Sequence, residues 1–109
     1  MQKGPGASIA KDIASAIRRE FSDATIILFG SRALGRELKE SDIDLIVVTD
    51  SFRNLEFVNR PAIVLRILRA ARIRVPVGLD LLCYTREEFE RKKHEIGTVA
   101  EALSYGIML

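Results

Sequence analysis

Apolar residues recur at two different spacings along the chain, and the change in spacing separates predicted helices from predicted strands. Over Ser8–Phe21, isoleucines repeat every four residues with charged residues between them, which predicts an amphipathic helix capped by Ser8. The short run Ala24–Phe29 is apolar and β-branched, which favours a buried strand. Residues 1–7 contain glycine and proline, and we expect them to fray.

The middle of the chain repeats this alternation of strand and helix. Ile43–Thr49 alternates briefly and then runs apolar, as a central strand covered on both faces would. Arg60–Arg74 has an apolar stripe opposite a row of arginines, with Pro61 in a first helical turn, and predicts a helix. Val77–Tyr84 predicts a third strand, interrupted by the charged residue Asp80.

The C-terminal third favours helices. Thr85 and Glu88 have the spacing of a capping box, which predicts a short helix over Arg86–Lys93. A last apolar stripe, from Ile96 to Ile107, serves either the core or a contact surface. The order of elements predicts one α/β (α+β) domain over residues 1–109, with a mixed central sheet flanked by helices.

The charge and the residue composition of the chain argue against several classes of function. The net charge of +2 over 109 residues is too small to indicate nucleic-acid binding. No signal peptide is visible, and no apolar run approaches the ~20 residues of a membrane helix. Cys83 is the only cysteine, which excludes an intrachain disulfide and fits the cytoplasm. With His94 as the only histidine, we expect neither a zinc site nor a Cys-His nucleophile.

The turn after the first predicted strand has the character of an anion site. Gly30 allows a ligand to approach the backbone closely, and one or two helical turns over Ser31–Glu37 would direct amide groups toward an anion. Ser31 adds a hydroxyl, and Arg32 or Arg36 adds charge. The Lys-Ser/Thr ending of a Walker A loop is absent. The alternative is a plain strand-to-helix turn.

Three aspartates suggest metal chemistry. Asp42 and Asp44 are two residues apart, so on an extended chain both point to one side and can flank divalent cations. Asp80 interrupts an apolar strand and would need a partner or a metal if buried. If the third strand lies beside the second, the three carboxylates would hold two hard cations such as Mg²⁺. The alternatives are solvated loop aspartates and an exposed or arginine-paired Asp80.

The segments GSRALG, SDIDLIVV and VGLDLLCYTREEFE occur in order at suitable distances. Together they resemble the signature of the polymerase-beta-type nucleotidyltransferase superfamily. Within it, nearly the whole chain resembles the minimal nucleotidyltransferases, the MNT half of HEPN–MNT toxin–antitoxin pairs. The resemblance implies the family's fold, a mixed sheet flanked by helices.

The resemblance also implies roles for individual residues. Asp42 and Asp44 would bind both Mg²⁺ ions, and Asp80 would complete the site and help to activate the incoming hydroxyl. Leu34 stands where the family often has a second arginine, which puts one phosphate contact in doubt. The residues expected to bind the nucleotide are Gly30, Ser31, Arg32 and Ser41.

Three functions are compatible with these residues. The leading hypothesis is Mg²⁺-dependent transfer of a nucleoside monophosphate, AMP from ATP, onto a hydroxyl of a partner protein, a small helical HEPN-type protein. The second is an antitoxin-like protein that neutralises a HEPN ribonuclease by contact. The third is a small-molecule adenylyltransferase, for which the chain is short. Self-association is compatible with all three.

Overall fold

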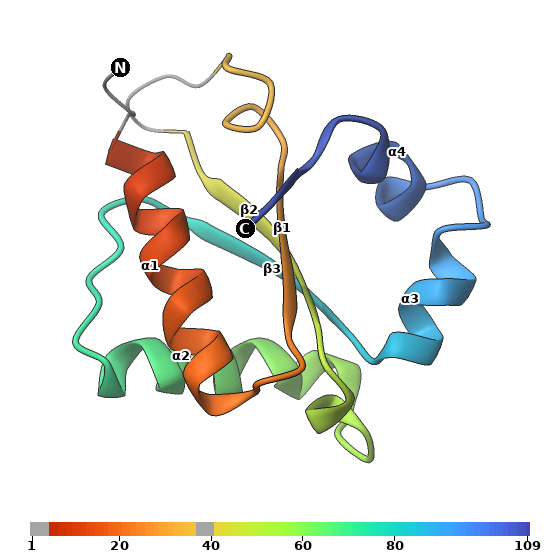
Figure 1. Ribbon diagram of the computed structural model, residues 1–109, viewed down its shortest axis with the longest axis horizontal. Coiled ribbons are helices and arrows are strands. Elements are labelled where there is room, and N and C mark those ends of the chain that lie inside the picture. Colours follow the sequence, from red (N-terminus) through yellow and green to blue (C-terminus); the bar gives the residue numbers. More distant parts are fainter. Residues whose placement is uncertain (1–4, 37–40) are drawn as a thin grey trace.

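The structure, a computed structural model, describes residues 5–36 and 41–109. In this part of the chain, one mixed four-stranded sheet has helices on both faces, as the sequence predicts (Figure 1). The elements are α1 (Pro5–Glu20), β1 (Thr25–Phe29), β2 (Ile43–Val48), η1 (Asp50–Phe52), η2 (Phe57–Asn59), α2 (Arg60–Ala70), β3 (Leu79–Tyr84), α3 (Arg86–Lys92), α4 (Thr98–Tyr105) and β4 (Ile107–Met108).

The sheet has the strand order β3–β2–β1–β4. Strand β1 is antiparallel to both β2 and β4, whereas β2 and β3 run parallel. A parallel pair needs a crossover connection, and the segment carrying α2 supplies it. The second and third strands are therefore neighbours, which is the condition on which the three-carboxylate site depends.

Two apolar clusters lie on the two faces of the sheet. Because side chains alternate along a strand, Leu45 and Val47 of β2 face α1 and α2, and Ile46 and Val48 face α3 and α4. Strands β1 and β2 are buried on both faces over most of their length, which explains why nearly all of their residues are apolar. We call these the α1/α2 face and the α3/α4 face.

Several predicted boundaries are wrong by a few residues. Helix α1 begins at Pro5, so Ser8 lies inside the helix instead of capping it, and Pro5–Ala7 are helical. Residues 1–4 lie outside the described residues. Helix α2 ends at Ala70, four residues before the predicted end, and Arg72 has a φ of 59°, which no helix accommodates. The capping box at Thr85 and Glu88 is present and starts α3.

The predicted C-terminal stripe does not form one buried face. Ile96 is fully exposed, Leu103 and Ile107 are also exposed, and the buried residues of α4 are Val99 and Ala102. The chain then leaves the helix at Gly106 and adds β4 to the edge of the sheet beside β1. In the described part of the chain, no helix combines the length and the apolar character needed to cross a bilayer.

Candidate active site

The Asp44 carboxylate packs directly against the backbone of Gly30 at the end of β1. Gly30 follows Phe29, which pairs with Asp44 on β2, and it has a φ of 76°. A β-carbon at Gly30 would overlap Asp44 Oδ2. The turn therefore needs glycine both for its left-handed backbone and for the space that the carboxylate occupies.

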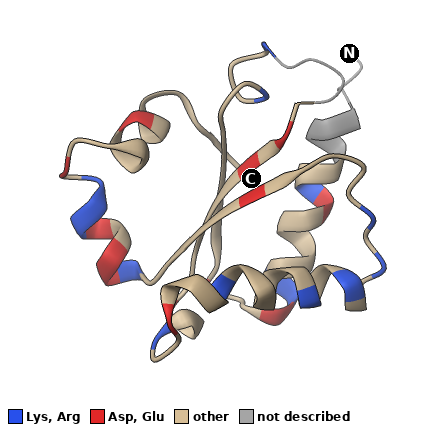
Figure 2. Ribbon diagram, turned by 180° about the vertical axis from the view of Figure 1, so that it is seen from behind, with Lys and Arg blue, Asp and Glu red and all other residues tan. Residues whose placement is uncertain are grey.

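Asp80 lies next to Asp44 in the register of β2 and β3. Burial raises the pKa of Asp44 to about 6, and a hydrogen bond with Asp80 and the charges of Asp80 and Asp42 act in the same direction. Asp80 itself is exposed on the edge strand, so of the two situations that the sequence left open, buried or exposed, the structure has the exposed one. The third strand does lie beside the second, which brings Asp80 next to Asp44. Figure 2 shows acidic segments on the two neighbouring strands.

Asp42 precedes β2 and is exposed. Its Oδ1 lies so close to Gly78 that a β-carbon there would overlap it, so a second glycine makes room for a second carboxylate. Carboxylate oxygens are the ligands that hard cations prefer, so the donor chemistry fits Mg²⁺. Within residues 5–36 and 41–109, however, no three Asp, Glu, His or Cys side chains are gathered closely enough to hold a metal ion.

The segment after Gly30 forms successive turns instead of the predicted helix. The amides of Ala33 and Leu34 donate to the Gly30 carbonyl, at 3.2 and 3.3 Å, and the Arg36 amide donates to the Ser31 carbonyl at 2.8 Å. These amides are occupied within the turn and do not form a helix N-terminus. Glu37, the predicted end of that helix, and residues 38–40 of the following loop lie outside the described residues.

Arg32 connects the turn to the start of β2. Its guanidinium donates to the Ser41 carbonyl from Nε at 3.1 Å and from Nη2 at 2.5 Å. The same positive charge lowers the pKa of Asp44, against the larger effects that raise it. Ser31 is half-buried beside Gly30. The structure thus brings Gly30, Ser31, Arg32 and Ser41 to the same end of the sheet as the acidic residues.

Tyr105 contacts Gly30 in this region, and the sequence did not predict that contact. The Gly30 amide donates to the Tyr105 hydroxyl at 3.1 Å. The contact exists because the Gly106 amide closes α4 onto the Ala102 carbonyl and β4 then pairs with β1. No local pattern marks a tyrosine at the end of one helix as the partner of a glycine 75 residues earlier.

Cys83 and His94 do not contribute to this site. Cys83 is buried in the sheet, and burial raises the pKa of its thiol to about 12. A thiol with that pKa is a poor nucleophile near neutral pH. His94 is exposed in the turn that follows α3. Cys83 is therefore a small residue of the core.

Comparisons with known proteins place the chain beside one family of domains. A family model described as "Nucleotidyltransferase domain" matches residues 10–105. No curated protein sequence matches the chain significantly. The crystal structure of a candidate nucleotidyltransferase from Sulfolobus solfataricus shares 28% sequence identity over 84% of each chain, with a TM-score of 0.58.

Two further structures share the fold alone. BolA1 from Arabidopsis thaliana is 16% identical over 73% of this chain and 94% of its own, with a TM-score of 0.55. The BolA domain of SufE1 from the same plant is 18% identical over 80% of this chain and 99% of its own, with a TM-score of 0.57. At these identities the likeness concerns the arrangement of helices and strands.

Proposed function

Because this chain belongs to the nucleotidyltransferase domain family, we propose that it moves AMP from ATP onto a hydroxyl group of a partner protein and releases pyrophosphate. Nucleotidyl transfer is the reaction of the family. The nucleotide, the cation and the acceptor are the proposed parts. The proposal is supported chiefly by the contact of the Gly30 turn with Asp44 and the pairing of Asp44 with Asp80.

We propose that Asp42, Asp44 and Asp80 hold two Mg²⁺ ions. Burial, and after it the carboxylates of Asp80 and Asp42, raise the pKa of Asp44, and a cation would relieve the repulsion among these carboxylates. Asp42 is exposed, and its charge already acts on Asp44. When bound, Mg²⁺ supplies positive charge that offsets the charge of the transferring phosphoryl group.

The remaining roles follow from position. Gly30 and Ser31 would contact the triphosphate at the end of β1, with Arg32 and the neighbouring Ser41 adding further contacts. Asp80 is exposed on the edge strand, where an incoming hydroxyl can reach it, and would accept the proton of that hydroxyl. Asp44 is half-buried and remains with the phosphate.

A protein acceptor is favoured by the exposed apolar end of the chain. Ile107 is 44% exposed and Met108 is 68% exposed, and both lie on the edge strand β4. Edge strands with apolar side chains invite contact with another chain. By the resemblance to HEPN–MNT pairs, the proposed partner is a small helical HEPN-type protein, in the cytoplasm. The same surface supports the second candidate, neutralisation of that partner by contact alone.

The test is to incubate the protein with radiolabelled ATP, Mg²⁺ and its co-encoded neighbour, and to separate the chains on a gel. We expect label to appear on the neighbour with the native protein and to be absent with the Asp42→Ala variant. A stable complex without label would contradict transfer and favour neutralisation by contact. If the gel shows no label and the two proteins form no complex, both transfer to the partner and neutralisation by contact are contradicted. A small-molecule acceptor would then remain.

A further inference from the structure

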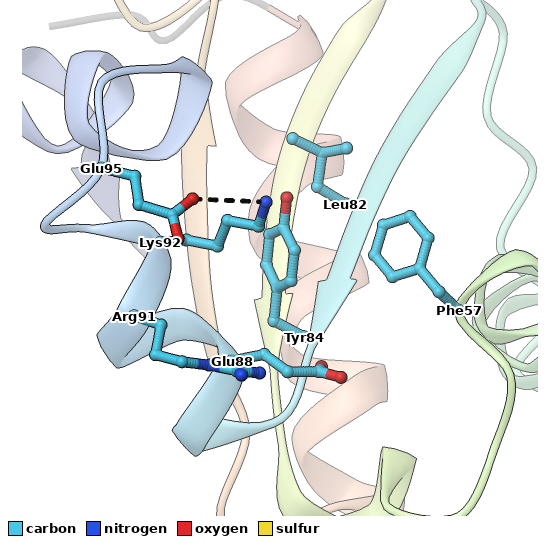
Figure 3. A pocket seen from close by; sticks show the side chains of 7 residues that line it. All are labelled: Phe57, Leu82, Tyr84, Glu88, Arg91, Lys92 and Glu95. Carbon is cyan, nitrogen blue, oxygen red and sulfur yellow. Dashed lines mark ion pairs between the residues drawn. The ribbon is translucent and has the colours of Figure 1, made fainter.

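A groove lies over β3 and begins at Leu82, two residues along the strand from Asp80. Its floor is formed by Leu82 and Tyr84 of β3, and its sides by Phe57 of η2 and by charged side chains of α3, with a cavity volume of about 590 Å³. Figure 3 shows Phe57 on one side of β3 and the α3 side chains on the other. This size and this mixture of aromatic, apolar and polar walls are typical of a small-molecule site.

The groove and the acidic residues share one face of the sheet. Asp80, Leu82 and Tyr84 alternate with residues of the opposite face, so all three lie on the α3/α4 face. The strand rise places the Cα atoms of Asp80 and Leu82 about 6.6 Å apart. A ligand held beside Asp44 and Asp80 therefore reaches Leu82 without leaving this face.

The direction of the reaction indicates which ligand the groove takes. In an in-line displacement, the leaving pyrophosphate and the attacking oxygen lie on opposite sides of the α-phosphorus. With the triphosphate at Gly30 on β1, that line crosses the strands from β1 through Asp44 on β2 to Asp80 on β3. The nucleoside is attached to the α-phosphate through an oxygen that lies to the side of the line joining the leaving and attacking oxygens. Because that line crosses the strands, a nucleoside that remains in contact with the sheet extends parallel to the strands.

We propose that the groove holds the nucleoside of the nucleotide substrate, with its base against Phe57 and Leu82. The inference rests on the proposed function, because it takes the α-phosphate to lie beside Asp44 and Asp80. Phe57 is 46% exposed, so its ring offers a surface for a base to contact. Stacking of a base on an aromatic ring is favourable for every base.

The groove is held in shape before any ligand binds. The Phe57 and Tyr84 rings are 5.6 Å apart, and the Arg60 guanidinium lies 5.7 Å from the centre of the Phe57 ring. Arg60 is 4% exposed and is fixed by the Glu88 carboxylate and by the Cys83 carbonyl. A preformed wall loses little conformational entropy on binding. Arg91, at the rim, forms no ion pair with another described residue and can contact a polar base edge.

The experiment compares calorimetric titrations of Mg²⁺–ATP with titrations of Mg²⁺–tripolyphosphate, which lacks the nucleoside. We expect Phe57→Ala to weaken ATP binding about 10-fold by loss of a stacking contact, and to leave tripolyphosphate binding unchanged. Val58→Ala is the matched control, because Val58 is the next residue of η2, is 77% exposed and does not line the groove. Leu82→Asn, at the floor, should act as Phe57→Ala does.

Two results would overturn the assignment of the groove alone. One is unchanged ATP affinity in both Phe57→Ala and Leu82→Asn, with thermal melts showing that the variants fold. The other is an equal loss of affinity for ATP and tripolyphosphate. If the native protein binds neither probe in Mg²⁺, the phosphate and cation site fails, and the proposed function falls together with the inference.

Discussion

Asp44 and Asp80 are paired neighbours on the parallel strands β2 and β3, and both side chains lie on the α3/α4 face of the sheet. Burial and the neighbouring carboxylates raise the pKa of Asp44 to about 6. Two carboxylates held together repel each other when both are ionised, and the folded chain maintains that repulsion. A carboxylate pair kept together at a cost in stability marks this end of the sheet as a candidate functional site.

Asp80→Ala is expected to remove transfer activity while leaving the metal-free stability unchanged or higher. The substitution removes a carboxylate that the transfer reaction would use. It also removes the repulsion between that carboxylate and Asp44. Thermal melts in EDTA, above the pKa of Asp44, measure the effect on stability. A large loss of stability in EDTA would show that Asp80 has a structural role.

The metal-free protein should lose stability as the pH rises through the pKa of Asp44. The folded-state pKa of about 6 lies above the ordinary value of 3.8, so the folded chain binds this proton more tightly than the unfolded chain. The stabilisation is complete below 3.8 and disappears as the pH passes about 6. Urea denaturation in EDTA, repeated at several pH values from below 3.8 to above 6, measures this dependence of the free energy of unfolding on pH. The Asp44→Asn variant should show a flatter dependence. An unchanged profile in Asp44→Asn would contradict the assignment.

Gly30→Ala should destabilise the protein by about 3 kcal/mol, from the left-handed backbone and from displacement of Asp44. Gly35→Ala is the matched control. Gly35 has a φ of 70°, and nothing lies within 4 Å of a β-carbon there. It should therefore show only the backbone cost, about 1 kcal/mol. Equal losses in urea denaturation of the two variants would mean that the Gly30–Asp44 contact carries no energy.

Arg60→Leu should destabilise the protein by about 3 kcal/mol, because it leaves the partly buried Glu88 carboxylate and the Cys83 carbonyl without their donor. The Arg60 side chain is 5% exposed and lies 2.5 Å from Glu88, whose pKa its hydrogen bond lowers to about 2. The control Arg53→Leu breaks an exposed pair with Asp50 at 3.6 Å and should change stability by less than about 1 kcal/mol. Urea denaturation of both variants decides the matter, and similar small losses would contradict a structural role for Arg60.

Local patterns in the sequence predicted the parts of the site that local structure determines. The apolar runs of β2 and β3 identify strands, and their adjacency brings Asp44 to Asp80. The capping box at Thr85 is likewise local, and the structure contains it.

Other features depend on contacts between distant segments, and the sequence did not reveal them. Strand β4 exists because Ile107 and Met108 pair with β1, although they continue the apolar stripe of α4. Asp80 interrupts an apolar run as a buried charge would, yet β3 is an edge strand and leaves it exposed. Periodicity does not distinguish an edge strand from a central one when both are apolar.

The central claim is that Asp44 and its neighbours catalyse transfer of the AMP moiety of ATP, with its α-phosphate, onto a hydroxyl group and the release of pyrophosphate. It is tested most directly by incubating the protein with Mg²⁺, its co-encoded neighbour and ATP labelled at either the α- or the γ-phosphate. We predict that α-label appears on the neighbour, that γ-label is released as pyrophosphate, and that Asp44→Asn abolishes both. Transfer of the γ-label, or full α-transfer by Asp44→Asn, would contradict the account.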